Sequence, residues 1–181
     1  MEKKWKILKS RKALDEEWFR VDSETVELPD KRRIDDYYVW NSGDVVLVVP
    51  YTKNKKFVLV KQYKHGIKEV VIEFPAGVLE KDEDPKIGAE REYLEETGHV
   101  SKDVELIATL SDNPTKQRGK GYVFLARDSE KKLEQKLDEF EDIEILEVDK
   151  DELLSMIEKG EIWISGTIAA AFIALRKLDI L

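Results

Sequence analysis

The 181-residue chain contains no cysteine, which excludes disulfides, a thiolate nucleophile and thiolate metal ligands. It has only two histidines, His65 and His99, and neither has the Ser or Cys partner arrangement that would indicate nucleophilic catalysis. No apolar run approaches the ~20 residues that cross a bilayer, and the start MEKKWKILKS lacks the apolar stretch of a signal peptide. We therefore expect a soluble, cytoplasmic protein that does not bind membranes.

Basic residues are outnumbered by acidic ones. The sequence has 31 Lys and Arg against 39 Asp and Glu, which gives a formal net charge of −8. This balance argues against a general binder of nucleic acid, although individual basic residues can still hold phosphates. With 41% apolar residues the chain can bury a core, and its length fits one domain or one core with an appendage.

What the sequence does contain is a succession of short apolar segments. Alternation and β-forming residues predict strands at 4–10, 16–28, 34–40, 45–51, 57–63, 70–75, 104–110, 121–126 and 143–148. The polar turn TKNKK after the fourth of these predicts a hairpin. Periodicity and end signals predict helices at 85–97, 150–159 and about 165–178. Mixed strands with helices packed outside predict an α/β or α+β sandwich.

Three glutamates fall on one face of the first predicted helix. An Asp-Pro pair at 84–85 is a good helix start, and Gly98 is a good C-terminal cap. Glu92, Glu95 and Glu96 are spaced i, i+3, i+4, so their carboxylates crowd together and repel. A hard divalent cation such as Mg²⁺ would reverse that penalty. Spacing alone does not separate such a metal site from an ordinary solvated acidic face.

A longer pattern surrounds these glutamates in the segment GVLEKDEDPKIGAEREYLEETGH, residues 77–99. Its Gly, Glu and Arg residues have fixed spacings at Gly77, Glu83, Arg91, Glu92, Glu95, Glu96 and Gly98. This pattern resembles the Nudix box, the signature of hydrolases that cleave a nucleoside diphosphate linked to another moiety. Tyr93 and His99 stand where that family usually has an aliphatic residue. We expect adjusted packing at these two positions and little loss of chemistry.

Motifs outside the box resemble the ADP-ribose pyrophosphatase branch of the family, in which a Gln-Tyr-Arg element precedes Glu-Phe-Pro-Ala-Gly. Here LVKQYKHG (59–66) precedes IEFPAG (72–77), and Lys64 replaces the usual Arg, so that a bidentate fork becomes a point charge. The branch also has a proline about fifteen residues beyond its box, and Pro114 stands there. The resemblance implies hydrolysis of ADP-ribose or a related nucleoside diphosphate sugar to a nucleoside monophosphate and a sugar phosphate.

The same resemblance implies a division of the chain. Residues 41–181 would form the Nudix hydrolase domain, an αβα sandwich of mixed sheets. Residues 1–40 would form an N-terminal antiparallel β segment. In this branch such strands pair with or cross to a partner subunit, so we expect a homodimer.

The resemblance also assigns metal ligands. Glu92 and Glu96 would bind the ion directly, Glu95 would share or support a metal, and Ala76 would add its backbone carbonyl. Mg²⁺ is the expected ion, with Mn²⁺ as the alternative. A salt bridge between Glu83 and Arg91 would fix the loop against the helix, and Glu83 could also reach the metal through water.

An acidic residue on a distant loop often orients or deprotonates the attacking water in this branch. The loop DEFEDIEI, residues 138–145, offers Glu141 as the first candidate and Glu139 as the second. The alternative interpretation is a solvated acidic loop without a role in catalysis.

Recognition of the base and sugar is harder to read from the sequence. A nucleobase stacks on aromatic faces, each worth ~1–3 kcal/mol, and Trp18 and Tyr38 are the candidates, although such residues more often serve in packing. Glu73 could accept hydrogen bonds from a ribose or an amine. Lys64 and Pro114 complete the predicted substrate-binding set.

Two other functions remain open at this point. The chain could prefer another sugar nucleotide, such as a GDP-sugar. It could also be a sensor that binds ADP-ribose without turnover, but such binders usually lose box carboxylates, and Glu92, Glu95 and Glu96 are all present.

Overall fold

The computed structural model describes residues 3–17 and 19–181. The chain forms two compact units. The N-terminal unit consists of the residues up to Asp44 together with Ser111–Lys120, and the larger unit consists of Val45–Leu110 and Gly121–Leu181. A short segment far along the chain therefore belongs to the same unit as the first strands.

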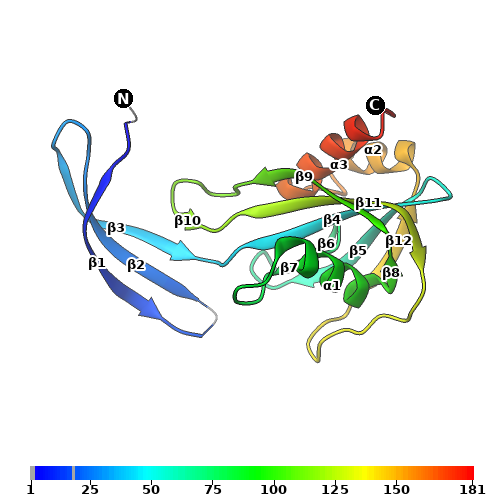
Figure 1. The fold of residues 1–181 in the computed structure, drawn as a ribbon, viewed down its shortest axis with the longest axis horizontal. Coiled ribbons are helices and arrows are strands. Elements are labelled where there is room, and N and C mark those ends of the chain that lie inside the picture. Colours follow the sequence, from blue (N-terminus) through cyan, green and yellow to red (C-terminus); the bar gives the residue numbers. More distant parts are fainter. Residues whose placement is uncertain (1–2, 18) are drawn as a thin grey trace. The chain divides into compact units, whose positions relative to one another are not determined.

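The N-terminal unit is a four-stranded sheet in the order β1-β2-β3-β10 (Figure 1). Its strands are β1 (Lys6–Asp15), β2 (Arg20–Glu27), β3 (Arg33–Asn41) and β10 (Gln117–Arg118). The first three pair antiparallel, whereas β10 adds in parallel to β3. Arg118 pairs with the carboxylates of Asp22 and Glu24 on β2, and these ion pairs hold the short strand in place.

The larger unit contains an eight-stranded sheet in the order β12-β5-β4-β11-β8, with β6 on β5, β7 on β4 and β9 on β11. The strands are β4 (Val45–Thr52), β5 (Phe57–Lys64), β6 (Glu69–Glu73), β7 (Ala76–Val78), β8 (His99–Val100), β9 (Asp103–Leu110), β11 (Gly121–Lys131) and β12 (Glu144–Val148). The helices are α1 (Pro85–Thr97), α2 (Lys150–Glu158) and α3 (Ser165–Lys177).

Alternation along the central strand β4 divides the core of this unit into two layers. Val46 and Val48 pack with Ala89 and Tyr93 of α1. Val49, on the opposite face, packs in the cluster that includes the buried residues of α2 and α3. Period-2 alternation along a strand sends successive side chains to opposite faces, so α1 covers one face and α2 with α3 the other (Figure 1). This confirms the predicted αβα sandwich.

The structure differs from the sequence prediction where pairing is not local. The strands of the predicted hairpin, β4 and β5, pair with each other at a single position, Tyr51 opposite Phe57. Along most of its length β4 pairs in parallel with β11, which lies about seventy residues later in the chain, at Gly121–Lys131. The strands β7, β8 and β10 have two or three residues each, which is too short for any periodicity to show. Among residues 3–17 and 19–181, no helix is long and apolar enough to cross a bilayer.

Candidate active site

Helix α1 has the ends that the sequence predicts. The Asp84 carboxylate accepts the backbone N–H of Lys86 at 2.9 Å, and Gly98 ends the helix in the left-handed conformation with φ 69°. Between these caps Glu92, Glu95 and Glu96 lie on one side of the helix, whereas Glu90 does not line the cleft. The caps therefore set which carboxylates reach the neighbouring cleft.

A cleft of about 300 Å³ lies beside α1 in the larger unit. It is lined by Ala76, Gly77, Val78, Arg91, Glu92, Glu95, Glu96, Lys136, Asp138 and Glu141. The structure thus brings together all four predicted metal ligands, the box arginine and the first candidate for the loop glutamate. They come from β7, from α1 and from the loop between β11 and β12.

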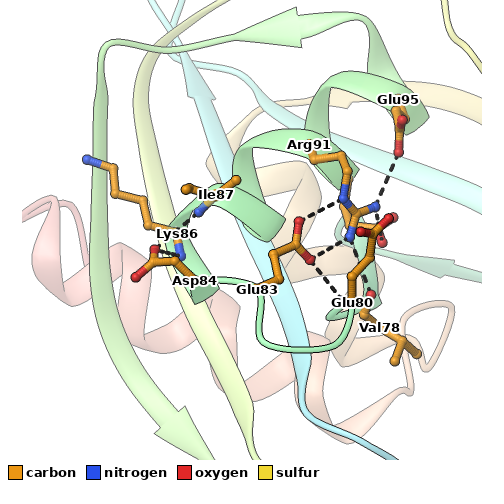
Figure 2. A network of polar contacts seen from close by, with 9 residues as sticks. Val78, Glu80, Glu83, Asp84, Lys86, Ile87, Arg91 and Glu95 are labelled. Atoms are coloured by element: carbon orange, nitrogen blue, oxygen red, sulfur yellow. Dashed lines mark hydrogen bonds and ion pairs between the residues drawn. The ribbon is translucent and has the colours of Figure 1, made fainter.

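Arg91 is the centre of the polar network at this cleft (Figure 2). Its Nε and one terminal nitrogen each donate to the Glu83 carboxylate at 2.9 Å, so the expected ion pair is present in bidentate form. The other terminal nitrogen donates to Glu92 at 2.8 Å and to Glu95 at 3.3 Å. Hydrogen bonding from Arg91 lowers the pKa of Glu83, so this carboxylate is ionised and fixes the loop before α1.

Glu96 is the most deeply buried carboxylate of the cleft. It is 3% exposed, and one oxygen accepts the backbone N–H of Ala76 at 3.0 Å. Burial raises its pKa from an ordinary 4.5 to about 8, and the negative charges of Glu92 and Glu73 act in the same direction. The pKa of Glu92 is also raised, chiefly by burial, with Glu95 and Glu141 contributing while Arg91 opposes the shift. The cleft therefore holds more negative charge than its own cations neutralise.

This donor set fits a hard divalent cation by its chemistry. All of the predicted ligand groups are oxygens, and a cation would compensate the charge that burial makes unfavourable. In the described residues no three acidic or imidazole side chains are gathered into a ready coordination shell. Arg91 and the Ala76 N–H hold those oxygens instead.

The structure gives a reason for the glycine at the first position of the box, Gly77. A Cβ atom on this residue would lie 2.0 Å from the carboxylate carbon of Glu92. Any larger residue would displace Glu92 from the position it occupies against β7. The glycine therefore leaves room for the close approach of a cleft carboxylate.

Lys64 and Glu73 are not among the residues that line the cleft, but they form an ion pair with each other close to Glu96. The Lys64 ammonium is 2.9 Å from the Glu73 carboxylate, which also accepts from the Gln62 amide at 3.1 Å. Their charges act on the pKa of Glu96 in opposite directions, which places both near that carboxylate. Both donors bond the same carboxylate oxygen of Glu73, Oε1.

The remaining predicted residues are not among those that line the cleft. Glu139 is exposed on the same loop as Glu141 but does not line the cleft. Tyr38 and Pro114 belong to the N-terminal unit. Trp18 lies outside the described residues.

Sequence reasoning did not single out Val78, Lys136 or Asp138 as residues of the cleft, although Asp138 begins the loop that it named. It did identify Tyr93 and His99 as departures from the box, and the structure shows how they are accommodated. The two buried rings stack on each other with centroids 6.3 Å apart, and the Tyr93 hydroxyl bonds to Ser129. We expected adjusted packing at these two positions, and there the two rings pack against each other.

Two family matches cover almost the whole chain. Residues 41–169 match the NUDIX domain, and residues 5–40 match the nucleoside diphosphate sugar hydrolase N-terminal domain. A crystal structure described as an ADP compounds hydrolase shares the fold, with a TM-score of 0.84 and 20% identity, covering 98% of this chain and 97% of that one.

Two curated relatives are similar over most of their length, and a third is similar over a shorter part. The ADP-ribose pyrophosphatase of Bacillus subtilis (strain 168) is 34% identical over 145 residues, which are 80% of this chain and 78% of that protein. The methanol dehydrogenase activator of Bacillus methanolicus is 31% identical over 166 residues, 91% of this chain and 89% of that protein. The ADP-sugar pyrophosphatase of Mus musculus is 34% identical over a shorter stretch of 77 residues, 40% of this chain and 35% of that protein.

Proposed function

Because this chain belongs to the Nudix family of hydrolases, we propose that it cleaves the pyrophosphate bond of ADP-ribose or a related nucleoside diphosphate sugar. The products are a nucleoside monophosphate and a sugar phosphate. The observation that carries this proposal is the complete box, with Glu92, Glu95, Glu96 and Glu141 gathered around one cleft. The N-terminal family match and the pyrophosphatase relatives support the substrate class.

Nudix hydrolases use divalent metal ions, and Mg²⁺ is the ion we propose here, with Mn²⁺ as the alternative. Glu92 and Glu96 would bind it directly, Glu95 would share or support it, and Ala76 would contribute its carbonyl. When bound, the ion neutralises charge on the pyrophosphate and activates water for in-line attack.

The chain's own groups supply the remaining chemistry. Glu141 accepts the proton of the attacking water as the water oxygen bonds to one phosphorus of the pyrophosphate, and the electron pair of the broken P–O bond stays on the bridging oxygen, which leaves with the other phosphate monoester. Arg91, anchored by Glu83, keeps Glu92 and Glu95 on the cleft side of α1. Glu139, the second candidate on the loop, lies outside the cleft and has no role in this scheme.

Substrate recognition extends the proposal to the N-terminal unit. Lys64 meets phosphate and Glu73 meets the ribose, while Trp18, Tyr38 and Pro114 provide the surface for the base. We also place the protein in the cytoplasm, without a nucleic acid partner. A homodimer through the N-terminal sheet is supported by β1, whose ten residues are all exposed at the edge of that sheet.

A second candidate function is binding of ADP-ribose without turnover. It is favoured by one observation, that a relative spanning 91% of this chain is named for activating another enzyme. The complete set of box carboxylates favours hydrolysis instead.

A screen of nucleoside diphosphate sugars separates the two candidates. Each compound is incubated with the protein and with Mg²⁺, with Mn²⁺ or with EDTA, and released phosphate monoesters are detected by coupled phosphatase. We expect metal-dependent release from ADP-ribose, and its loss in Glu96→Gln. Binding of ADP-ribose by calorimetry without release under any metal condition would support the second candidate and overturn the first.

A further inference from the structure

The C-terminal turn of α1 is capped from two directions. The last four carbonyls of a helix lack partners within the helix. The Leu94 carbonyl accepts the Gly98 N–H at 2.8 Å, and the Thr97 carbonyl accepts from the His99 ring at 3.0 Å. These two bonds come from residues that directly follow the helix.

The other two carbonyls of that turn are capped by residues 132–143, which we call the glutamate loop. The Glu95 carbonyl accepts the Lys136 N–H at 2.9 Å, and the Glu96 carbonyl accepts the Gln135 side-chain amide at 2.7 Å. The loop that carries Glu141 is therefore bonded to the backbone of two proposed metal ligands.

Gln135 also closes the glutamate loop on itself. The same side-chain nitrogen donates to the Ile143 carbonyl at 3.1 Å, at the point where the loop ends and β12 begins. Both hydrogens of the amide are thus used, one on the helix and one on the far end of the loop. Glutamate has no donor for this role, and asparagine is one methylene too short to span the same two carbonyls.

Gly98 allows the loop to come this close. Its carbonyl accepts the N–H groups of Lys132 and Leu133 at 2.9 and 3.1 Å. A Cβ atom on Gly98 would lie 2.1 Å from the Leu133 carbonyl oxygen. The glycine that ends α1 therefore also admits the base of the glutamate loop.

The tip of the loop depends on this base. In the described part of the chain, the hydrogen bonds of residues 137–142 lie within the tip: Asp138 N–H to the Glu141 carboxylate at 3.0 Å, and Glu141 N–H to the Asp138 carbonyl at 3.1 Å. Phe140 is 94% exposed and anchors nothing. The place of Glu141 at the cleft is therefore set from the base, where Gln135 makes two bonds.

We propose that Gln135 is a positioning residue for the hydrolysis, because its side-chain amide ties the glutamate loop to α1 and so holds Glu141 opposite the carboxylates of that helix. This inference rests on the proposed function, in which Glu141 handles the attacking water.

The first test is Gln135→Met, which keeps the length of the side chain and removes both donors. We expect kcat with ADP-ribose and Mg²⁺ to fall at least ~10-fold, with KM changed less than ~2-fold, because a group that acts in the transition state is misplaced. Gln135→Asn should show the same loss, and it serves if the Met variant does not fold. Glu134→Met introduces the same side chain at the neighbouring, 94% exposed position and should keep the wild-type kcat.

A double-mutant cycle with Glu141→Gln distinguishes positioning from a general loss of structure. If Gln135 acts through Glu141, Gln135→Met should change kcat less than ~2-fold in the Glu141→Gln background. An equal loss in both backgrounds would overturn the inference, since Gln135 would then act through Glu96 or through folding. A wild-type kcat in Gln135→Met or in Glu141→Gln would also overturn it. The proposed hydrolysis is judged separately, by the activity of Glu96→Gln.

Discussion

The two faces of the sheet in the larger unit are built from the same strands but hold very different residues. On one face, α3 buries Ala170, Ala171, Ala174 and Leu175 against apolar side chains of β4 and β11. On the other, α1 buries Ala89 and Tyr93 and, along the same helix, Glu96. The first face contributes stability, whereas the second holds carboxylates that burial destabilises. The proposed active site therefore lies on the less favourable face of the sheet.

The largest expected effect is on activity, from the charged face. Glu96→Gln keeps the size of the side chain and the bond from the Ala76 N–H but removes a charged oxygen ligand. We expect turnover to fall at least ~100-fold while the protein stays folded. Steady-state rates at saturating Mg²⁺, with circular dichroism as the control for folding, measure this. Near wild-type turnover would refute the metal assignment.

The matching change on the apolar face should affect stability instead. Leu175→Ala leaves a cavity where Leu175 is fully buried, and we expect a loss of about 3 kcal/mol in the free energy of unfolding. The kcat of the folded protein should remain within ~2-fold of wild type. Urea unfolding measures the loss of stability. Rates measured at urea concentrations well below the unfolding midpoint measure the kcat of the folded protein. A large loss of kcat with unchanged stability would contradict the division between the faces.

The pH dependence of stability should also distinguish the faces. In metal-free protein the folded Glu96, with its pKa raised to about 8, keeps a proton that the unfolded chain releases near its ordinary 4.5. The contribution of Glu96 is thus fully present below pH 4.5 and is lost as the pH rises through 8, by roughly 5 kcal/mol. Urea unfolding in EDTA from pH 5 to 8.5 measures this slope, which should be smaller in Glu96→Gln. An equal slope in both proteins would show that other groups cause it.

The smallest expected effect distinguishes the proposed metal ligand Glu92 from the proposed structural pair of Arg91 and Glu83. Because burial raises the pKa of Glu92, Glu92→Gln should raise the metal-free unfolding free energy at pH 8 by about 1 kcal/mol. Arg91→Ala should lower it, since Glu83 would lose both of its bonds from the guanidinium. Melting curves without metal compare the two variants. Two unchanged melting temperatures would count against this assignment.

Local patterns of the sequence determined helix α1 and its carboxylates. The Asp84 cap, the Gly98 stop and the spacing of the glutamates act within a few residues of each other, so they can be read without knowledge of the fold. The same holds for the alternation of β4, whose valines were assigned to a strand before their faces were known. These features predicted the sandwich and the carboxylates that face its cleft.

Only the tertiary structure decided which distant segments meet that helix. Gln135 and Lys136 donate to carbonyls at the end of α1 some forty residues earlier, and the same loop carries Lys136 and Glu141 to the cleft; no local pattern marks such bonds. The parallel pairing of β4 with β11, and the joining of Ser111–Lys120 to the N-terminal unit, are equally non-local. The physical reason is that capping and periodicity depend on neighbours in the chain, whereas loop closure and strand pairing depend on which unsatisfied backbone groups come together when the core is buried.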